Sequence, residues 1–198
     1  MSSPMAPSDT VVLIGPMAVG KTAVGRMLAR RTGRTFVDTD RVLVERYGPI
    51  RGLFDQHGEE GFRLLEADVV QGAVTDAGIV SLGGGAVLDA GTQAVLQDAA
   101  VVFLDTDART VLPRISRDSK RPLLAGNPLE RWQELYDQRR PIYARLASVV
   151  IDTRGLSVRG TADAVVRALP HLLPDRHTAS PPRTAGANHE SRTDTHGD

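Results

Sequence analysis

The residues best suited to chemistry lie near the start of the chain. Gly15, Gly20, Lys21 and Thr22 form the pattern G-x-x-x-x-G-K-S/T, which is typical of phosphate-binding loops. In such a loop, inward-pointing backbone N–H groups and the start of the next helix surround an anion. The lysine reaches the β- and γ-phosphates, and the threonine hydroxyl binds Mg²⁺. An apolar run precedes the loop at 10–14 and a helical pattern follows it, so the sequence predicts a nucleotide site.

Ala18 stands where many such loops carry another glycine. Glycine adopts a positive φ without strain, whereas alanine in the left-handed region costs about 1 kcal/mol. The methyl group is tolerated if φ of Ala18 is negative, and the loop is strained if it is positive. The loop residues expected to hold the nucleotide are Gly15, Ala18, Val19, Gly20, Lys21, Thr22 and Ala23.

Two acids follow the second apolar run, in the segment Asp38-Thr39-Asp40. Ligands bind open α/β sheets at the carboxyl ends of the strands, where this segment is expected. In that position, Asp38 can hold a water molecule of Mg²⁺, and Asp40 can accept a hydrogen bond from a hydroxyl group of the phosphate acceptor. Alternatively, one of the three residues caps a helix N-terminus. Both interpretations stay open on this segment alone.

Arg63 and Glu66 are three residues apart and therefore share a helix face. Glu66 is placed to orient Arg63 toward an anionic substrate. The alternative is a surface ion pair, which would stabilise the fold by under about 1 kcal/mol. Considered without the other motifs, the spacing of Arg63 and Glu66 favours this alternative.

Three glycines, Gly83, Gly84 and Gly85, follow another apolar run. Their backbone N–H groups have no side chains in front of them, which suits close packing against a substrate. A flexible turn is the alternative, and the tight position after a strand disfavours it.

The segment 114–124 carries four basic residues and one acid and lacks periodicity. It predicts a mobile lid, at about 114–125, that closes over ATP and brings an arginine to the γ-phosphate. A solvated charged loop is the alternative. Farther on, Arg139 and Arg140 precede Pro141 in a helical pattern, and a guanidinium there can grip a carboxylate through two hydrogen bonds.

Alternating strands and helices must position these residues. The predicted strands cover 10–14, 35–40, 78–85, 99–105 and 147–152. The predicted helices cover the stretch from the loop to Gly33, and 58–76, 107–117, 128–144 and 157–173. This order favours parallel pairing with helices on both faces, which is a three-layer α/β/α sandwich. We expect one domain at 10–174, a loose arm at 1–9 and a disordered tail at 175–198, which is poor in large apolar residues.

Composition narrows the classes of function. The chain has 198 residues with 24 basic and 24 acidic side chains, and this balance argues against a general nucleic-acid partner. The absence of cysteine excludes thiolate chemistry and fits a reducing cytoplasm. No secretory signal is evident and no apolar run reaches the ~20 residues of a membrane helix, so no membrane partner is expected. A monomer is the expected state, because no long unpaired apolar stripe is evident.

Taken in order, the segments GPMAVGKT, DTD, the pattern from Phe54 to Glu66, LGGGAV, RPLL and RRPIY resemble those of the shikimate kinase family over about 10–170. The resemblance implies a P-loop kinase that phosphorylates the 3-hydroxyl of shikimate with ATP and Mg²⁺, on the route to chorismate and aromatic amino acids. It implies shikimate-binding roles for Asp40, Arg63, Gly84 and Arg139, with Gly83 and Gly85 beside them.

The resemblance also implies a nucleotide and metal side. Lys21 and Thr22 match the phosphate and Mg²⁺ positions, and Asp38 matches an outer-shell magnesium acid. Arg121 matches the lid arginine that contacts the ATP phosphates. Arg114 matches an arginine at the base of the lid, near the adenine. The implied catalytic set is Lys21, Asp40 and Arg121. Ala18 departs from a common family glycine, and the segment 154–156 matches the adenine-contacting segment poorly, so no role is assigned there.

Two rival functions share the phosphate loop. A related small-metabolite kinase, such as a gluconate kinase, needs no pair of arginines beside the three glycines. A non-catalytic nucleotide switch needs Lys21 and Thr22 but neither Asp40 nor Arg139.

Overall fold

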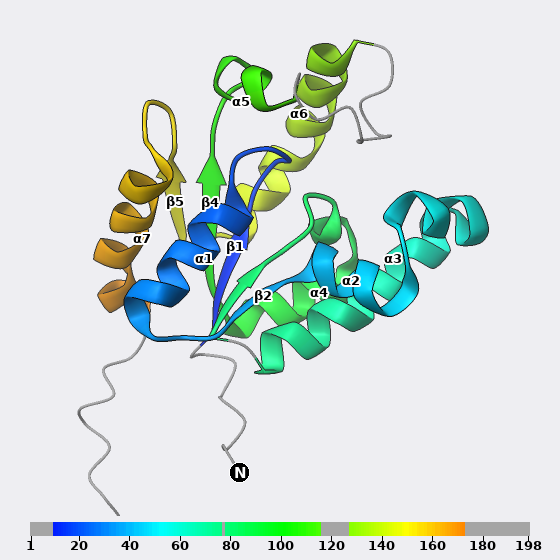
Figure 1. Ribbon diagram of the computed structural model, residues 1–198, viewed down its shortest axis with the longest axis horizontal. Helices are drawn as coiled ribbons and strands as arrows, with labels where there is room; N and C mark the ends of the chain where they lie inside the picture. Colours follow the sequence, from blue (N-terminus) through cyan, green and yellow to red (C-terminus); the bar gives the residue numbers. More distant parts are fainter. Residues whose placement is uncertain (1–9, 77, 116–126, 173–198) are drawn as a thin grey trace, which may run out of the picture.

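A five-stranded parallel sheet forms the centre of the molecule (Figure 1). The computed structural model describes residues 10–76, 78–115 and 127–172. Its strands lie in the order β2-β3-β1-β4-β5, so β1 has a parallel neighbour on each side. Their bounds are β1 Val11–Ile14, β2 Phe36–Asp38, β3 Ile79–Ser81, β4 Ala100–Asp105 and β5 Val149–Asp152.

Helices cover both faces of the sheet, which confirms the predicted three-layer sandwich. Successive side chains of a strand point to opposite faces, so Val11 and Leu13 pack with α1 and α7, and Val12 and Ile14 pack with α3 and α6. The helices are α1 Lys21–Thr32, α2 Thr39–Tyr47, α3 Ile50–Asp76, α4 Ala90–Val95, α5 Ala108–Ile115, α6 Pro128–Leu146 and α7 Val158–Leu172. No helix in these described ranges is long and apolar enough to cross a membrane.

The sequence prediction was wrong in several elements. The predicted strand 35–40 ends at Asp38, because the Asp38 carboxylate accepts a hydrogen bond from the Arg41 N–H and starts α2. The predicted helix 58–76 is the second part of α3, which begins at Ile50 and is interrupted at Gly58, with φ of 67° and ψ of −175°. The helices α2 and α4 were not predicted.

Several predicted segments fall partly outside the described residues. The predicted helix 107–117 is described as α5 up to Ile115, so Arg114, at the start of the predicted lid, lies in the last turn of a helix. The remainder of the predicted lid, 116–125, which includes Arg121, lies outside the described residues, as do the arm at 1–9 and the tail at 175–198. The domain bounds therefore stay a prediction.

Candidate active site

The phosphate loop joins β1 to α1 at the carboxyl edge of the sheet. Gly15 has a φ of 140°, and a Cβ there would lie 2.5 Å from the Leu104 carbonyl oxygen, so this position requires glycine. Gly20 has a φ of 107° and directly precedes the first turn of α1. The Lys21 Nζ donates to the carbonyls of Gly15 at 2.8 Å and Pro16 at 3.0 Å. The ammonium is therefore held within the loop that the sequence assigned to phosphate.

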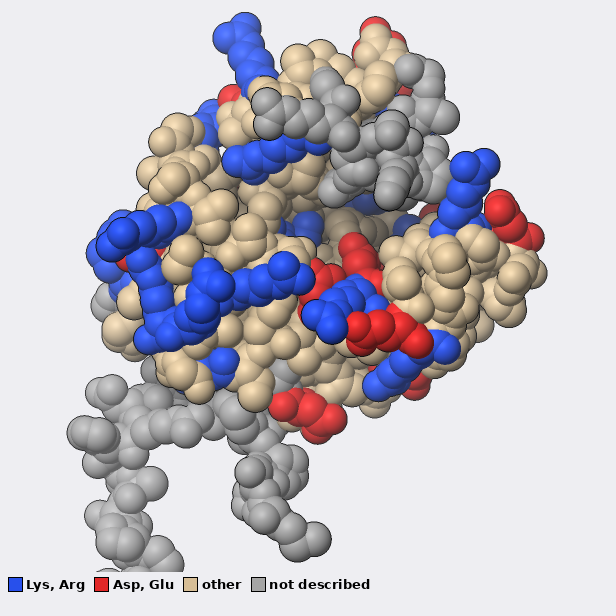
Figure 2. All heavy atoms as spheres, in the orientation of Figure 1, with Lys and Arg blue, Asp and Glu red and all other residues tan. Residues whose placement is uncertain are grey.

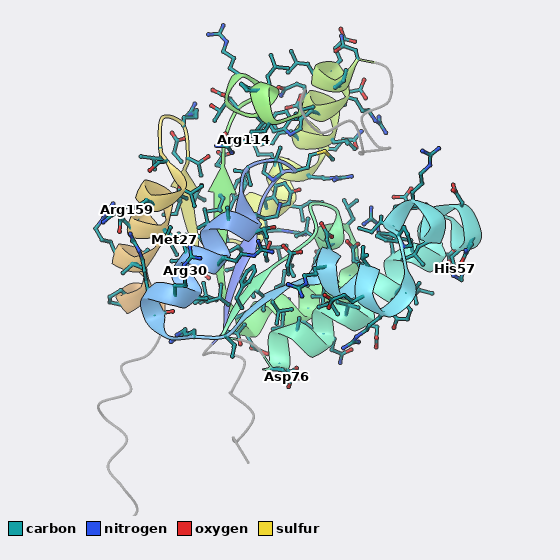
Figure 3. The ribbon with its side chains drawn as sticks, viewed as in Figure 1. Met27, Arg30, His57, Asp76, Arg114 and Arg159 are labelled. Carbon is teal, nitrogen blue, oxygen red and sulfur yellow. The ribbon has the colours of Figure 1, made fainter. Side chains whose placement is uncertain are left out.

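Ala18 adopts a positive φ of 64°, so the strained alternative holds. It is the one non-glycine residue with positive φ in the described ranges. Arg114, labelled in Figure 3, reaches from α5, and its Nη1 donates to the carbonyls of Ala18 and Val19, each at 3.0 Å. The structure thus brings Arg114 to the predicted nucleotide loop.

The Thr22 hydroxyl and the Asp38 carboxylate meet beside this loop, with 2.5 Å between Oγ1 and Oδ2. Asp38 also caps α2 through its other oxygen, which confirms the N-cap alternative and leaves the magnesium role a prediction. Mg²⁺ in nucleotide sites takes one or two protein oxygens and completes its shell with phosphates and water. The described residues contain no cluster of three or more His, Cys, Asp or Glu that could hold a metal alone. The Thr22–Asp38 pair therefore fits the predicted Mg²⁺ in its donor chemistry.

Side chains from two helices crowd the three glycines that follow β3. A Cβ on Gly83 would lie 2.5 Å from Asp40 Oδ1 and 2.7 Å from Glu66 Oε1. A Cβ on Gly85 would lie 2.6 Å from Arg63 Nη1. These glycines accordingly let two carboxylates and a guanidinium approach the backbone. The structure brings the predicted acceptor residues Asp40, Arg63 and Gly83 to Gly85 together.

The ion pair between Arg63 and Glu66 belongs to the interior of this cluster. Arg63 Nη1 donates to Glu66 Oε2 at 2.5 Å, and the two side chains are 15% and 3% exposed. Burial raises the pKa of Glu66, and the charge and hydrogen bond of Arg63 oppose that shift. The surface-pair alternative is wrong, because Glu66 holds one side of the guanidinium out of water.

Arg139 reaches the same cluster from α6. Its side chain is 7% exposed, and its Nε has no hydrogen-bond partner in the structure. Like Arg63, it lowers the pKa of Glu66 against the larger effect of burial, so both guanidinium groups act on one carboxylate. Arg63 Nε is likewise buried without a hydrogen-bond partner. Two cations, each with a buried Nε donor that is unused, suit an anionic ligand.

The neighbouring Arg140 faces elsewhere. Its Nε donates to the Tyr136 hydroxyl at 2.9 Å and its Nη2 to Asp105 Oδ2 at 3.3 Å. Of the two adjacent arginines, only Arg139 contributes to the acceptor cluster.

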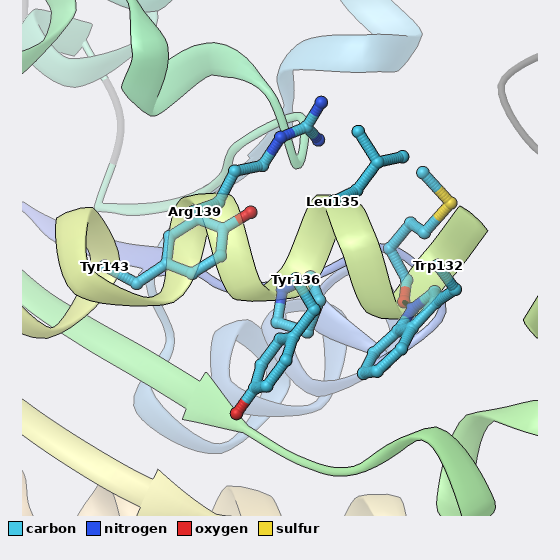
Figure 4. A pocket seen from close by; sticks show the side chains of 7 residues that line it. Trp132, Leu135, Tyr136, Arg139 and Tyr143 are labelled. Carbon is cyan, nitrogen blue, oxygen red and sulfur yellow. Dashed lines mark hydrogen bonds between the residues drawn. The ribbon is translucent and has the colours of Figure 1, made fainter. Parts of the chain in front are cut away.

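Sequence reasoning missed two aromatic residues that fasten α6 to the site. The Trp132 indole donates to the Met17 carbonyl at 3.0 Å, and the Tyr143 hydroxyl donates to the Gly84 carbonyl at 2.5 Å. Burial raises the pKa of Tyr143 to about 12, which keeps this donor protonated. A small pocket between α6 and the phosphate loop is lined by Pro16, Met17, Trp132, Leu135, Tyr136, Arg139 and Tyr143 (Figure 4). The spacing of Trp132, Tyr136, Arg139 and Tyr143 on one helix face was the available signal.

The two halves of the site lie at one edge of the sheet, where the carboxyl ends of β1, β2 and β3 meet. The space-filling view shows a hollow in this face of the molecule, with acidic and basic side chains at its border (Figure 2). The arrangement can hold a polyphosphate on the backbone of one half and a small anionic molecule with hydroxyl groups on the other.

Comparison with known proteins shows the family of the chain. The sequence model of the family described as "Shikimate kinase" matches residues 17–170. The curated shikimate kinase of Streptomyces coelicolor is 40% identical over 171 residues, which cover 85% of this chain and 97% of that protein. The solved shikimate kinase of Acinetobacter baumannii, in complex with shikimate, is 35% identical, with a TM-score of 0.77 over 81% of this chain and 92% of its own.

A gluconokinase from Sinorhizobium meliloti also has a similar structure, with a TM-score of 0.55 over 85% of this chain, but it is only 16% identical. That likeness extends to the fold alone. The family match and the curated relative, by contrast, cover most of the sequence that builds both halves of the site. The chain belongs to the shikimate kinase family.

Proposed function

We propose that this protein transfers the terminal phosphoryl group of ATP to the 3-hydroxyl of shikimate, giving shikimate 3-phosphate and ADP on the route to chorismate. Membership of the shikimate kinase family makes it an ATP-dependent phosphotransferase. One observation carries the choice of acceptor. Two arginines whose buried Nε atoms have no hydrogen-bond partner, Arg63 and Arg139, lie around the three glycines beside the phosphate loop.

On the acceptor side, Arg63 and Arg139 bind the shikimate carboxylate. A guanidinium grips a carboxylate through two parallel hydrogen bonds, and low exposure strengthens both. Glu66 keeps Arg63 in place through the 2.5 Å contact. Gly83, Gly84 and Gly85 let the ring approach the backbone. With the carboxylate anchored at the far end of the ring, the reacting hydroxyl is directed toward the nucleotide.

On the donor side, the loop from Gly15 to Ala23 binds the ATP phosphates through its backbone N–H groups and Lys21. Thr22 would be a ligand of Mg²⁺ and Asp38 would hold one of its waters, and the bound ion would supply positive charge against the phosphates. Arg114 contributes at the nucleotide end of the loop. Arg121, which lies outside the described residues, is proposed to contact the γ-phosphate.

Asp40 orients the 3-hydroxyl and accepts its proton. Phosphoryl transfer passes through a loose transition state, so the nucleophile needs positioning more than full deprotonation. The Asp40 carboxylate suits this role because it belongs to the acceptor cluster beside Gly83. It reaches the cluster from the first turn of α2, directly after β2.

The test is ADP release measured by a coupled assay with shikimate, with gluconate and with no acceptor. We expect release that depends on shikimate and stays at background with the other two. Release with gluconate would favour the related small-metabolite kinase. ADP release that is independent of any acceptor would favour a nucleotide-binding module and reject the proposal. ATP binding without any ADP release would do the same.

A monomer acting in the cytoplasm stays our prediction from the sequence. Light scattering of the purified chain checks the first part, and fractionation of cells expressing it checks the second.

A further inference from the structure

Ala18 is held in a conformation that its own side chain disfavours. With φ of 64°, it occupies the left-handed region, where the Cβ of an L-residue crowds the following carbonyl group. Such strain persists only when the surroundings fix the backbone. Because Ala18 lies in the middle of the loop, what fixes it also determines the shape of the phosphate site.

Two side chains outside the loop hold the two peptide groups that flank Ala18. The Trp132 indole N–H donates to the Met17 carbonyl at 3.0 Å, and this peptide plane sets φ of Ala18. The Arg114 guanidinium donates to the Ala18 carbonyl at 3.0 Å, and that plane sets ψ. Both backbone angles of the strained residue are therefore restrained from α5 and α6.

The indole is itself rigidly placed. Trp132 is 1% exposed and stacks on Tyr136 with ring centroids 5.0 Å apart. The Tyr136 hydroxyl donates to Asp105 at the end of β4, at 2.6 Å. Met17 and Ala18 pack against the buried cluster that contains Trp132, so the same side chain contacts the strained segment and donates to it. The donor is thus anchored to the sheet and cannot follow the loop if the loop relaxes.

We propose that Trp132 and Arg114 form a clamp that keeps the backbone of Ala18 in the left-handed region. The clamp preorganises the phosphate loop, a task for which a glycine at position 18 would need no outside contacts. Trp132 acts here as a positioning residue for the nucleotide. The inference rests on the proposed function only in that the loop binds nucleotide phosphate. It predicts that the importance of Trp132 depends on which residue stands at position 18.

The experiment is a double-mutant cycle of Trp132→Phe and Ala18→Gly, with Mg²⁺–ADP binding measured by calorimetry. In the parent protein, losing the indole donor should weaken ADP binding about three- to ten-fold. In the Ala18→Gly background, the same change should weaken it by no more than about two-fold, because glycine remains left-handed without help. Shikimate binding, measured separately, should change less than ADP binding. The matched control is Tyr47→Phe, which removes an aromatic polar group from the surface of α2.

Equal losses of ADP affinity in both backgrounds would overturn the clamp. Equal losses of ADP and shikimate affinity would also overturn it, because α6 carries Arg139 and a merely displaced helix would weaken both ligands. A parent protein that binds no ADP would overturn the clamp together with the proposed function, so the two failures are distinguishable.

A second variant guards against misfolding of Trp132→Phe. Trp132 is the single tryptophan of the chain, so growth on the isostere 3-benzothienylalanine replaces only this side chain and exchanges its N–H for sulfur. The shape of the core is kept while the donor is lost. The same dependence on position 18 is expected, and its absence would refute the clamp.

Discussion

The two halves of the site solve the problem of binding an anion differently. The nucleotide half is contiguous, from Gly15 to Thr22, and relies on backbone groups at the start of α1. The acceptor half gathers side chains from α2, α3, the loop after β3, and α6, and relies on buried charges. In the first, the residues are constrained mainly by the backbone, as at Gly15, where a Cβ would lie 2.5 Å from the Leu104 carbonyl oxygen. In the second, Arg63, Arg139 and Asp40 all act on the charge of Glu66, so a single change disturbs several residues.

The largest effect is expected at the reacting hydroxyl. Asp40→Asn should lower kcat about 100-fold or more while the affinity for ATP is unchanged, since the carboxylate serves only the acceptor. Steady-state kinetics and calorimetry with ATP measure the two quantities. A loss of kcat with unchanged affinity for ATP would show that the acceptor half can be disturbed without affecting the nucleotide half.

The matched control for that variant is Asp68→Asn on the exposed side of α3. It should leave kcat as in the parent protein. Near-normal turnover of Asp40→Asn would contradict the role of Asp40.

The next largest effect is expected at the carboxylate grip. Arg139→Ala should raise the KM for shikimate about 10- to 100-fold, because a charged hydrogen-bonding group is lost from a buried site. The KM for ATP should stay within about two-fold if the halves are independent. Initial rates at varied shikimate and varied ATP test both values.

Arg140→Ala is the neighbouring control, because that guanidinium contacts Asp105 and Tyr136 instead. It should leave the KM for shikimate within about two-fold, as exposed ion pairs contribute little. Equal KM values for the two arginine variants would count against the assignment of Arg139.

A smaller effect is expected from adding one methyl group to the acceptor loop. Gly85→Ala would place a Cβ 2.6 Å from Arg63 Nη1, and Glu66 holds that guanidinium, so it cannot move without cost. We expect the KM for shikimate to rise about three- to ten-fold. Gly52→Ala in α3 has open space around its Cβ and should not change this KM. A parent-like KM for Gly85→Ala would show that the loop tolerates a side chain.

The smallest effect concerns pH. Burial raises the pKa of Glu66, so the folded state binds this proton more tightly than the unfolded state does. That contribution to stability is present at acid pH and is lost as the pH rises through the raised pKa. Glu66→Gln cannot ionise, so its melting temperature relative to the parent protein should increase from about pH 4 toward neutrality. A difference in melting temperature that is constant or decreases over this range would refute the assignment.

The contrast between a contiguous nucleotide half and an acceptor half gathered from several elements also decides what could be predicted from the sequence. The place of the phosphate loop between β1 and α1 was predicted correctly, since the spacing of its residues is local. Arg63 and Glu66 were predicted as neighbours, but nothing in their spacing distinguishes a surface pair from one in which Glu66 is 3% exposed. Only packing at long range makes that difference.

The bonds missed from the sequence were also at long range. Trp132 donates to a carbonyl 115 positions away and Tyr143 to one 59 positions away, and a backbone acceptor leaves no residue-type signature. The helix α2 was missed because Asp38 serves both as its N-cap and as the partner of Thr22. Because the segment 38–40 supports two interpretations, its sequence does not show where β2 ends and α2 begins.

The position of the single tryptophan has a practical consequence. Its indole lies against the phosphate loop, in a dry cluster with Val111 and Ile115. Light absorbed selectively by tryptophan is therefore emitted from one known place, beside the Met17 carbonyl of the phosphate loop. The protein carries its own optical reporter, and stopped-flow emission can time the arrival of nucleotide without any attached dye.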